Sequence, residues 1–131
     1  MSSGELHLTC SYGCPSPSPP LTSFVSCRRW DVRKGDFTSP DLTLRGHTNT
    51  ITGLSLSPSG THLLSNGMEG GLLKWDVRPF VSDETKRLEA SFDGARHGAE
   101  QLLLRCNWSP VGPDGSQKVA CGSADRYVVC Y

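Results

Sequence analysis

Apolar and polar residues alternate along several short runs of the chain. The run TGLSLSP places Leu54 and Leu56 two positions apart, and the run LRCNWSP places Cys106 and Trp108 in the same way. Alternation of this kind predicts β-strands with one buried face. No segment shows the apolar period of a helix, so the predicted fold class is all-β.

Turn residues separate these runs. Each of the two strands above is followed by Ser-Pro and then by a turn that contains glycine, at Gly60 and at Gly115. Further turns are expected at Glu69-Gly70-Gly71 and at Asp125-Arg126. The remaining strands are expected around residues 42–44, 63–64, 88–92 and 119–120, and immediately before residues 75 and 131.

The tetrapeptide Trp-Asp-Val-Arg occurs twice, at residues 30–33 and 75–78, although the chain holds only three tryptophans. Four short antiparallel strands in a repeat of about 40 to 45 residues are typical of a β-propeller blade. We therefore predict two four-stranded blades, around residues 41–76 and 88–131, with a remnant of a third before them.

The start of the chain differs from the rest. Prolines cluster in residues 15–20, and proline cannot donate to a sheet ladder. The prediction is a disordered Ser/Pro-rich tail over residues 1–25 and a partial propeller over residues 26–131. A blade buries its faces only against neighbouring blades, and Tyr131 lies within a predicted third strand, so we expect an incomplete propeller.

Composition narrows the function. Lys plus Arg equals Asp plus Glu, at 13 each, whereas a protein that grips phosphates needs a basic excess. We expect no direct nucleic-acid binding. The sequence shows no membrane-spanning run and no signal peptide, and its six cysteines fit free thiols. We therefore expect a soluble intracellular protein.

A metal site is the first chemical alternative. His7, Cys10 and Cys14 would supply three zinc ligands. Zinc sites of this kind usually pair two such clusters, and no second compact cluster follows. We therefore expect neither a metal nor a cofactor.

The dipeptide Gly46-His47, the turn at Glu69 and the pair Trp75-Asp76 resemble the WD-repeat family of β-propellers in their spacing, with Glu69 where the family has aspartate. The resemblance implies that a histidine, a serine, an acidic residue and the tryptophan hydrogen-bond together inside each blade. The candidates for this network are His47, Ser65, Glu69 and Trp75, with His97 and Asp125 in the second repeat. That repeat departs from the pattern, because Cys121 replaces the serine and Tyr131 the tryptophan.

The same groups also suggest a catalytic triad, in which a base oriented by a carboxylate activates a hydroxyl. His47 and Ser65 would then act with an acidic residue. The repeated spacing favours the structural network instead, and no G-x-S-x-G elbow is present. We expect no enzymatic activity.

The runs WDVRPF, LLRCNWSP and GSADRYV are similar to WD-repeat proteins of spliceosomal ribonucleoprotein particles. This implies a nuclear scaffold of pre-mRNA splicing that contacts a large spliceosomal scaffold protein and other particle subunits. Trp-Asp-x-Arg also resembles the motif by which WD-repeat proteins dock on the adaptor of cullin-four ubiquitin ligases. A substrate receptor of such a ligase is the alternative function, and Arg33 and Arg78 are the candidates for partner binding.

Overall fold

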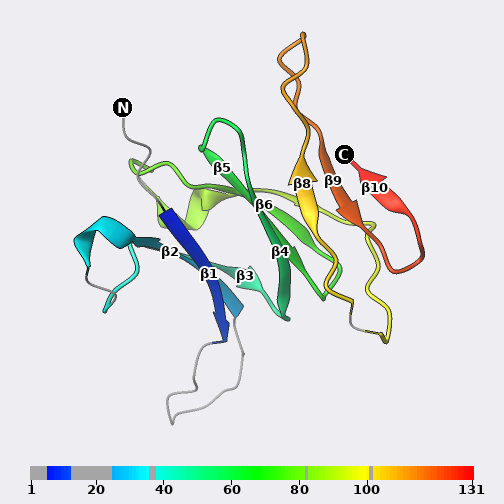
Figure 1. Cartoon of the computed structure of the whole chain (residues 1–131), viewed down its shortest axis with the longest axis horizontal. Helices are drawn as coiled ribbons and strands as arrows, with labels where there is room; N and C mark the ends of the chain where they lie inside the picture. Colours follow the sequence, from blue (N-terminus) through cyan, green and yellow to red (C-terminus); the bar gives the residue numbers. More distant parts are fainter. Residues whose placement is uncertain (1–5, 13–24, 36–37, 82, 101) are drawn as a thin grey trace. The chain divides into compact units, whose positions relative to one another are not determined.

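The computed structural model of the chain (Figure 1) describes residues 6–12, 25–35, 38–81, 83–100 and 102–131. The chain divides into two compact units, Met1–Asn49 and Thr50–Tyr131. Within the described residues, the regular structure consists of antiparallel β-strands and two short 3-10 helices. The predicted all-β fold class is confirmed.

The first unit contains one three-stranded sheet, in the order β1-β2-β3. Its elements are β1 (Leu6–Tyr12), β2 (Val25–Asp31), the 3-10 helix η1 (Val32–Lys34) and β3 (Leu42–His47). The buried apolar residues of β2 and β3 alternate, as the period of a strand requires, although Ser26 is also buried. These apolar residues are Val25, Cys27, Leu42 and Leu44.

Strand β1 lies within the segment for which the sequence predicts a disordered tail. It pairs with β2 from Leu6 opposite Asp31 to Tyr12 opposite Val25. The difference has a simple cause: the prolines begin only at Pro15, so residues 6–12 keep the amide hydrogens that a ladder needs. The proline-rich stretch itself falls in residues 13–24, outside the described residues.

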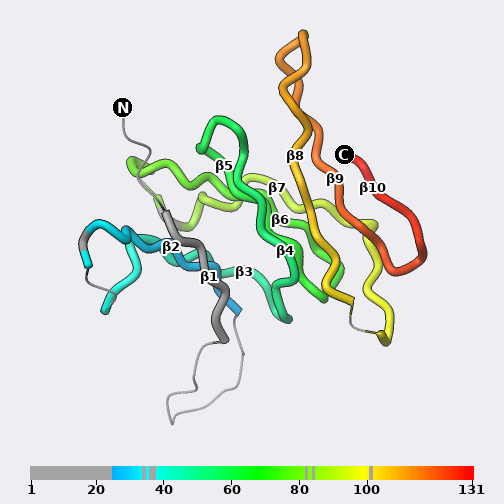
Figure 2. The backbone as a smooth tube through the Cα atoms, viewed as in Figure 1, coloured from blue at the N-terminus to red at the C-terminus, as the bar shows by residue number. Residues whose placement is uncertain are grey.

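The second unit contains a four-stranded sheet and a three-stranded sheet. The first runs β4-β5-β6-β7, and β8 and β10 flank β9 in the second. The elements are β4 (Ile51–Leu56), β5 (His62–Gly67), β6 (Leu72–Asp76), the 3-10 helix η2 (Glu84–Arg87), β7 (Leu88–Phe92), β8 (Cys106–Trp108), β9 (Val119–Gly122) and β10 (Val128–Cys130). In Figures 1 and 2, β8 lies beside β4.

The core of the second unit lies between its two sheets. Leu64 and Leu72 from the first sheet are completely buried and meet Cys106 and Cys121 from the second. The aromatic rings of Phe92 and Tyr131 close the cluster, with centroids 5.0 Å apart. Face-to-face packing of two sheets removes this apolar surface from water, which is the main stabilising term in such a unit. The full cluster comprises Leu64, Leu72, Ala95, Cys106, Val119 and Cys121, with Phe92, Trp108, Val129 and Tyr131 packed against it.

The expected turns are present at both repeats. Gly70 adopts a φ of 92° between β5 and β6, where its amide bonds to the carbonyl of Gly67 at 3.0 Å. Arg126 occupies the matching turn between β9 and β10 with a φ of 72°, in the left-handed region that a glycine adopts more easily. The second repeat therefore keeps the turn at a cost in backbone strain.

The hydrogen-bonded sheets do not follow the limits of the sequence repeat. Strand β3 pairs with β2 in the first unit, although the predicted blade of residues 41–76 includes it. Strand β7 pairs with β6 and completes the four-stranded sheet, which runs over Ile51–Phe92. The first strand of each predicted blade, β3 or β7, thus pairs with the strands that precede it in the chain. Among the described residues, the second sheet of this unit has three strands instead of the predicted four.

Candidate functional site

The network that the resemblance predicts is built around Trp75 and Ser65. The Trp75 indole Nε1 donates to the Ser65 hydroxyl at 2.7 Å, and both side chains are buried. Strands β5 and β6 pair Leu63 with Trp75 and Ser65 with Leu73, so the bond crosses the ladder diagonally. A buried indole N–H needs an acceptor, and this serine supplies one.

His47 and Glu69 complete the predicted set in the first repeat. His47 ends β3 in the first unit and is 1% exposed. Glu69 is exposed in the turn between β5 and β6 of the second unit. The structure therefore brings together Ser65 and Trp75 within one sheet. The wider four-residue network remains a prediction.

The second repeat satisfies its polar groups differently. Tyr131 replaces the tryptophan, and its hydroxyl donates to the Asp93 carbonyl at 2.7 Å. Cys121, in the serine position, belongs to the apolar core. The Cys106 thiol lies opposite Cys121 across the ladder, and burial raises the pKa of Cys106 to about 12. This thiol therefore stays protonated and unreactive near neutral pH.

His97 and Asp125 lie on neighbouring segments but are not paired. The Arg96 amide donates to the Ser123 hydroxyl at 2.9 Å, which holds this loop against the β9–β10 turn. Ser123 also lowers the pKa of the Asp125 carboxyl through a side-chain hydrogen bond. Neither ring nitrogen of His97 has a hydrogen-bond partner among the described residues.

The two arginines of the repeated tetrapeptide make the same local contact. Asp31 accepts from the Arg33 amide at 3.1 Å and from its Nε at 3.0 Å. Asp76 accepts from the Arg78 amide at 2.9 Å and from its Nε at 3.0 Å. Each carboxylate thus clamps the arginine two residues later. We call these two contacts the Asp-x-Arg clamps.

The second clamp is the more buried of the two on its acidic side. The Asp76 side chain is 6% exposed and that of Arg78 is 58% exposed. Hydrogen bonds from Arg78 lower the pKa of Asp76 to about 2. The buried Arg87 adds support from behind, because its Nη1 donates to the Arg78 carbonyl at 3.0 Å and to the Asp76 carbonyl at 3.2 Å. The clamp is therefore a structural feature that leaves one edge of the Arg78 side chain exposed.

A seam between β4 and β8 was not visible in the sequence. A register shift between Ile51 and Gly53 makes Thr52 the extra residue of a β-bulge, which re-aims its side chain. The Thr52 hydroxyl donates to the Leu104 carbonyl at 2.7 Å, and Asn66 Nδ2 donates to the same oxygen at 3.2 Å. The partners are 52 and 38 residues apart, so no local pattern could have revealed them.

Gly53 lets the two strands approach within this seam. A Cβ atom at Gly53 would lie 3.1 Å from Arg105 Cα and 3.2 Å from Cys106 N. Both are backbone atoms and cannot easily yield. The close approach allows two bonds further along, from the Ser55 hydroxyl to Asn107 Oδ1 and from Trp108 Nε1 to the Ser55 carbonyl, both at 3.0 Å.

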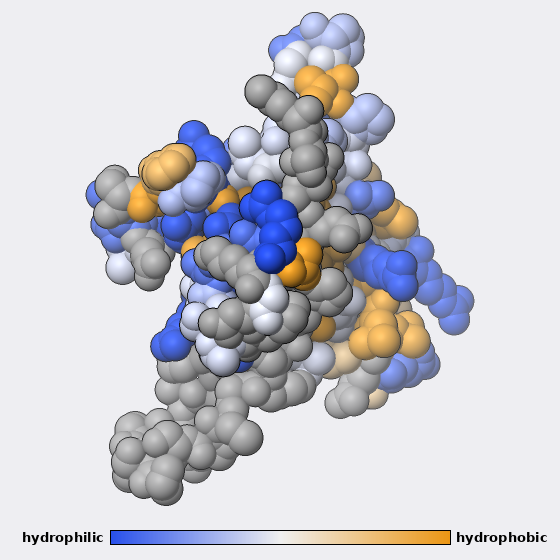
Figure 3. Space-filling view, turned by 60° about the vertical axis from the view of Figure 1, so that its left-hand side comes forward, coloured by the Kyte–Doolittle hydropathy of each residue, from blue (hydrophilic) through white to orange (hydrophobic). Residues whose placement is uncertain are grey.

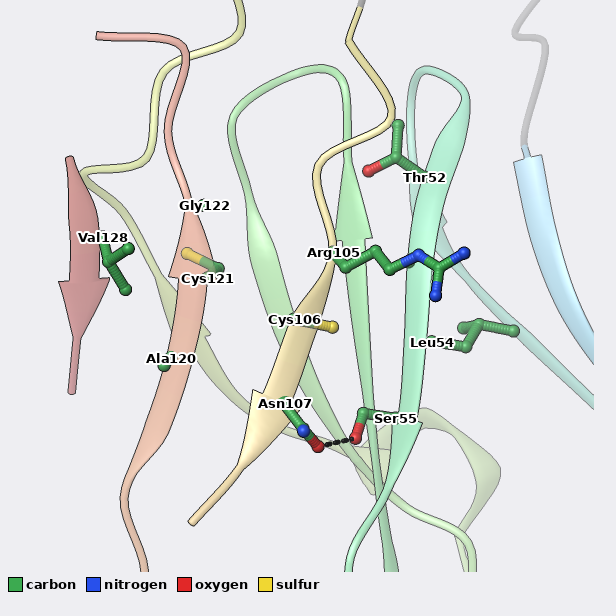
Figure 4. Close-up of a pocket in the computed structure, with 11 residues that line it drawn as sticks. Thr52, Leu54, Ser55, Arg105, Cys106, Asn107, Ala120, Cys121, Gly122 and Val128 are labelled. Carbon is green, nitrogen blue, oxygen red and sulfur yellow. Dashed lines mark hydrogen bonds between the residues drawn. The ribbon is translucent and has the colours of Figure 1, made fainter. Parts of the chain in front are cut away.

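A hollow of about 630 Å³ opens beside this seam. Figure 4 shows Arg105 reaching from the start of β8 towards β4, between Thr52 and Leu54. The side chains that line the hollow are neutral apart from Arg105. The full lining is Thr52, Gly53, Leu54, Ser55, Arg105, Cys106, Asn107, Ala120, Cys121, Gly122 and Val128.

A row of hydrogen bonds elsewhere in the unit joins a hydroxyl, an imidazole and a carboxylate. Thr61 Oγ1 lies 2.8 Å from His62 Nδ1, and His62 Nε2 lies 3.1 Å from Glu89 Oε1. Lys74 forms an ion pair with the other oxygen of Glu89 at 2.9 Å, and it is the main cause of the lowered pKa of that carboxyl. The Thr61 hydroxyl is also bonded to Ser59 at 2.7 Å. The row therefore ties β5, β6 and β7 together through groups that are already partnered.

The proposed zinc ligands lie outside the part of the molecule whose side chains are described. Among the side chains that are described, no group of three or more His, Cys, Asp or Glu could hold a metal ion. The described residues also contain no helix that is long and apolar enough to cross a membrane.

Comparisons with known proteins extend this picture. Residues 38–76 match the family model of the WD domain, G-beta repeat. The U5 small nuclear ribonucleoprotein 40 kDa protein of Homo sapiens is 50% identical over 86 residues, which are 66% of this chain and 22% of that protein. The pre-mRNA-splicing factor cwf17 of Schizosaccharomyces pombe is 38% identical over 99 residues, 76% of this chain and 25% of its own length.

Among solved structures, the WD40 domain of Toxoplasma gondii coronin gives a TM-score of 0.45 at 12% identity. The match covers 82% of this chain and 31% of that one. The chain spans about a fifth of the length of the curated U5 relatives that it matches. The resemblance is confirmed as a partial match: residues 38–76 match a WD repeat, and the chain is similar to part of the U5 small nuclear ribonucleoprotein 40 kDa protein.

Proposed function

We propose that the chain acts as a nuclear protein–protein scaffold in pre-mRNA splicing, within the U5 small nuclear ribonucleoprotein. The observation that carries the proposal is the 50% identity over 86 residues to the 40 kDa protein of that particle. The similarity to the splicing factor cwf17 points to the same process. The partners would be a large spliceosomal scaffold protein and other subunits of the particle.

The surface supports a binding role. Figure 3 shows one face, on which hydrophobic patches lie among hydrophilic residues. Phe80 is 96% exposed, and Leu103 and Tyr127 are each 71% exposed. Exposed apolar patches bordered by polar residues commonly mark contacts with other proteins. The charged groups of the Asp-x-Arg clamps and the row from His62 to Glu89 act as structural partners, which favours scaffolding over catalysis.

The ubiquitin-ligase alternative depends on Arg78. Its Nε and amide are both bonded to Asp76, so fewer of its donors are left for a partner protein. We therefore favour the splicing scaffold, and Arg78 separates the two functions experimentally.

Affinity purification of the tagged full chain from nuclear extract tests the proposal. We expect recovery of the U5 RNA and of the large scaffold protein, with Arg78→Ala recovering both as well as the wild type. The control Leu64→Asp, which places a charge in the buried core, should lose both. Recovery of a cullin and its adaptor without the particle RNA, abolished by Arg78→Ala, would contradict the proposal and support the ligase receptor.

A further inference from the structure

We infer that the hollow beside the β4–β8 seam binds an acidic segment of a partner protein, through a carboxylate that pairs with Arg105. This inference deepens the proposed scaffold function by naming the chemistry of one partner. It concerns a binding event that can be measured without the splicing particle, so either conclusion can fail alone.

Charge is the first argument. Arg105 is exposed, and its guanidinium has no hydrogen-bond or ion-pair partner among the residues that the structure describes. The residues that line the hollow include no aspartate or glutamate. The planar guanidinium fork suits a carboxylate, which it can bind through two parallel hydrogen bonds.

Asn107 supplies the second argument. Its Oδ1 accepts from the Ser55 hydroxyl at 3.0 Å and from the Trp108 amide at 2.9 Å. These bonds fix the orientation of the amide, because its oxygen is occupied. The two hydrogens of Asn107 Nδ2 are then available for a ligand. Figure 4 shows Asn107 bonded to Ser55, with Arg105 just before the first residue of β8.

The hydroxyls of the hollow are also committed. Thr52 donates to Leu104, and Ser55 donates to Asn107. The polar side chains with free capacity are therefore the donors Arg105 and Asn107, and a ligand must bring acceptors. Leu54 and the 69% exposed Val128 add apolar surface to the lining, which suits an acidic residue beside an aliphatic one.

The same features favour a protein over a nucleic acid. The chain carries no formal net charge, and the hollow presents one cation. Phosphate binding to RNA needs several basic groups. The lining also holds no aromatic ring on which a base could stack.

Fluorescence anisotropy with the full chain tests the inference. The probe is a fluorescein-labelled peptide of alternating glutamate and valine, titrated at low salt. Arg105→Gln should weaken binding about tenfold, the change expected when a charge-assisted hydrogen bond is lost. Arg105→Lys keeps the charge and should give an intermediate loss, which shows that the variant site is folded.

The matched control is Lys118→Gln, which removes one exposed positive charge away from Arg105. Lys118 precedes Val119, which pairs with Trp108 at the other end of the β8–β9 ladder. We expect a change of less than about twofold, as for a rim charge in water. A peptide with glutamine in place of glutamate should bind at least about tenfold more weakly.

Equal binding of the two peptides, or equal binding by Arg105→Gln and the wild type, would overturn the inference. Tighter binding of a single-stranded RNA probe than of the acidic peptide would do the same. If the acidic peptide binds as expected but no particle is recovered from nuclear extract, the inference holds and the proposed splicing function fails.

Discussion

The two sheets of the second unit each place an aromatic residue with a polar atom at the end of the third strand, and they satisfy that polar atom differently. In the four-stranded sheet, the Trp75 indole donates to the buried Ser65 hydroxyl. In the three-stranded sheet, Cys121 replaces the serine and is buried in the core, while the Tyr131 hydroxyl turns to the Asp93 carbonyl. One sheet buries a polar pair, and the other moves its polar atom towards solvent and keeps a purely apolar interior.

The comparison teaches that the repeat preserves geometry more strictly than it preserves hydrogen bonds. Both sheets keep the strand pairing and the turn with positive φ. A buried N–H or O–H must find an acceptor or leave the interior. A tyrosine can do the latter because its hydroxyl sits at the tip of the ring.

The largest difference should appear when the two aromatic residues are truncated. Trp75 is 3% exposed, so Trp75→Ala should lower the free energy of unfolding by about 4 kcal/mol. Tyr131 is only half-buried, and Tyr131→Ala should cost about 2 kcal/mol. Urea unfolding of the full chain, followed by far-ultraviolet circular dichroism, measures both. Equal losses would show that the two sheets are not distinguished in this way.

The polar pair itself gives the next effect. Ser65→Ala leaves the buried indole N–H without its acceptor and should cost about 2 kcal/mol. In a Trp75→Phe background, which has no N–H to satisfy, the same Ser65→Ala change should cost less than about 1 kcal/mol. The difference between the costs of Ser65→Ala in the two backgrounds gives the contribution of the Trp75–Ser65 hydrogen bond to stability. A cost that is unchanged in the Phe background would mean that Ser65 acts through packing alone.

The seam between the sheets should respond more weakly. Gly53→Ala places a methyl group 3.1 Å from the backbone of Arg105, and the tight fit should cost about 1.5 kcal/mol. Gly71 is a matched control, because a methyl group there would meet Glu69 Cγ at an ordinary 3.8 Å. Gly71→Ala should therefore be nearly neutral in the same urea experiment. A neutral Gly53→Ala would show that the two strands can separate without loss.

The smallest effect concerns acid stability. Since the pKa of Asp76 falls from 3.8 to about 2 in the folded chain, its contribution is complete above pH 3.8 and disappears as the pH falls towards 2. Arg78 is largely exposed to solvent, so we expect the contribution to be about 1 kcal/mol. Asp76→Asn should remove this part of the pH dependence between pH 5 and 2. An identical pH profile for the variant would contradict the role of the clamp.

Local patterns predicted much of what the structure contains. Alternation located the strands around Leu54, Cys106 and Val119, and glycine located the turns at Gly60, Gly70 and Gly115. These features are local, because strand period and turn chemistry act over a few residues. The Ser65–Trp75 contact was reached only through the family resemblance, and the structure records that bond.

Two expectations differ from the structure. Residues 6–12 form a strand that pairs with β2, and the alternation of Leu6, Leu8, Cys10 and Tyr12 with polar residues is the local pattern that the nearby prolines outweighed in the prediction. The sequence offers the arginines at positions 33 and 78 as partner-binding candidates, yet each folds back on the aspartate two residues before it. Side-chain direction after a strand depends on the turn that follows, which here is set by the aspartate itself.

By itself, the sequence determined the all-β class, the repeat and its turns, because these depend on periodicity and on single residues with restricted backbone geometry. Only the tertiary structure decided which strands share a sheet and which side chains meet across the seam at Thr52, Gly53 and Asn107. Those contacts join segments about 50 residues apart. They exist because the buried apolar faces of two sheets must pack together, and that packing brings a donor-rich hollow beside Arg105.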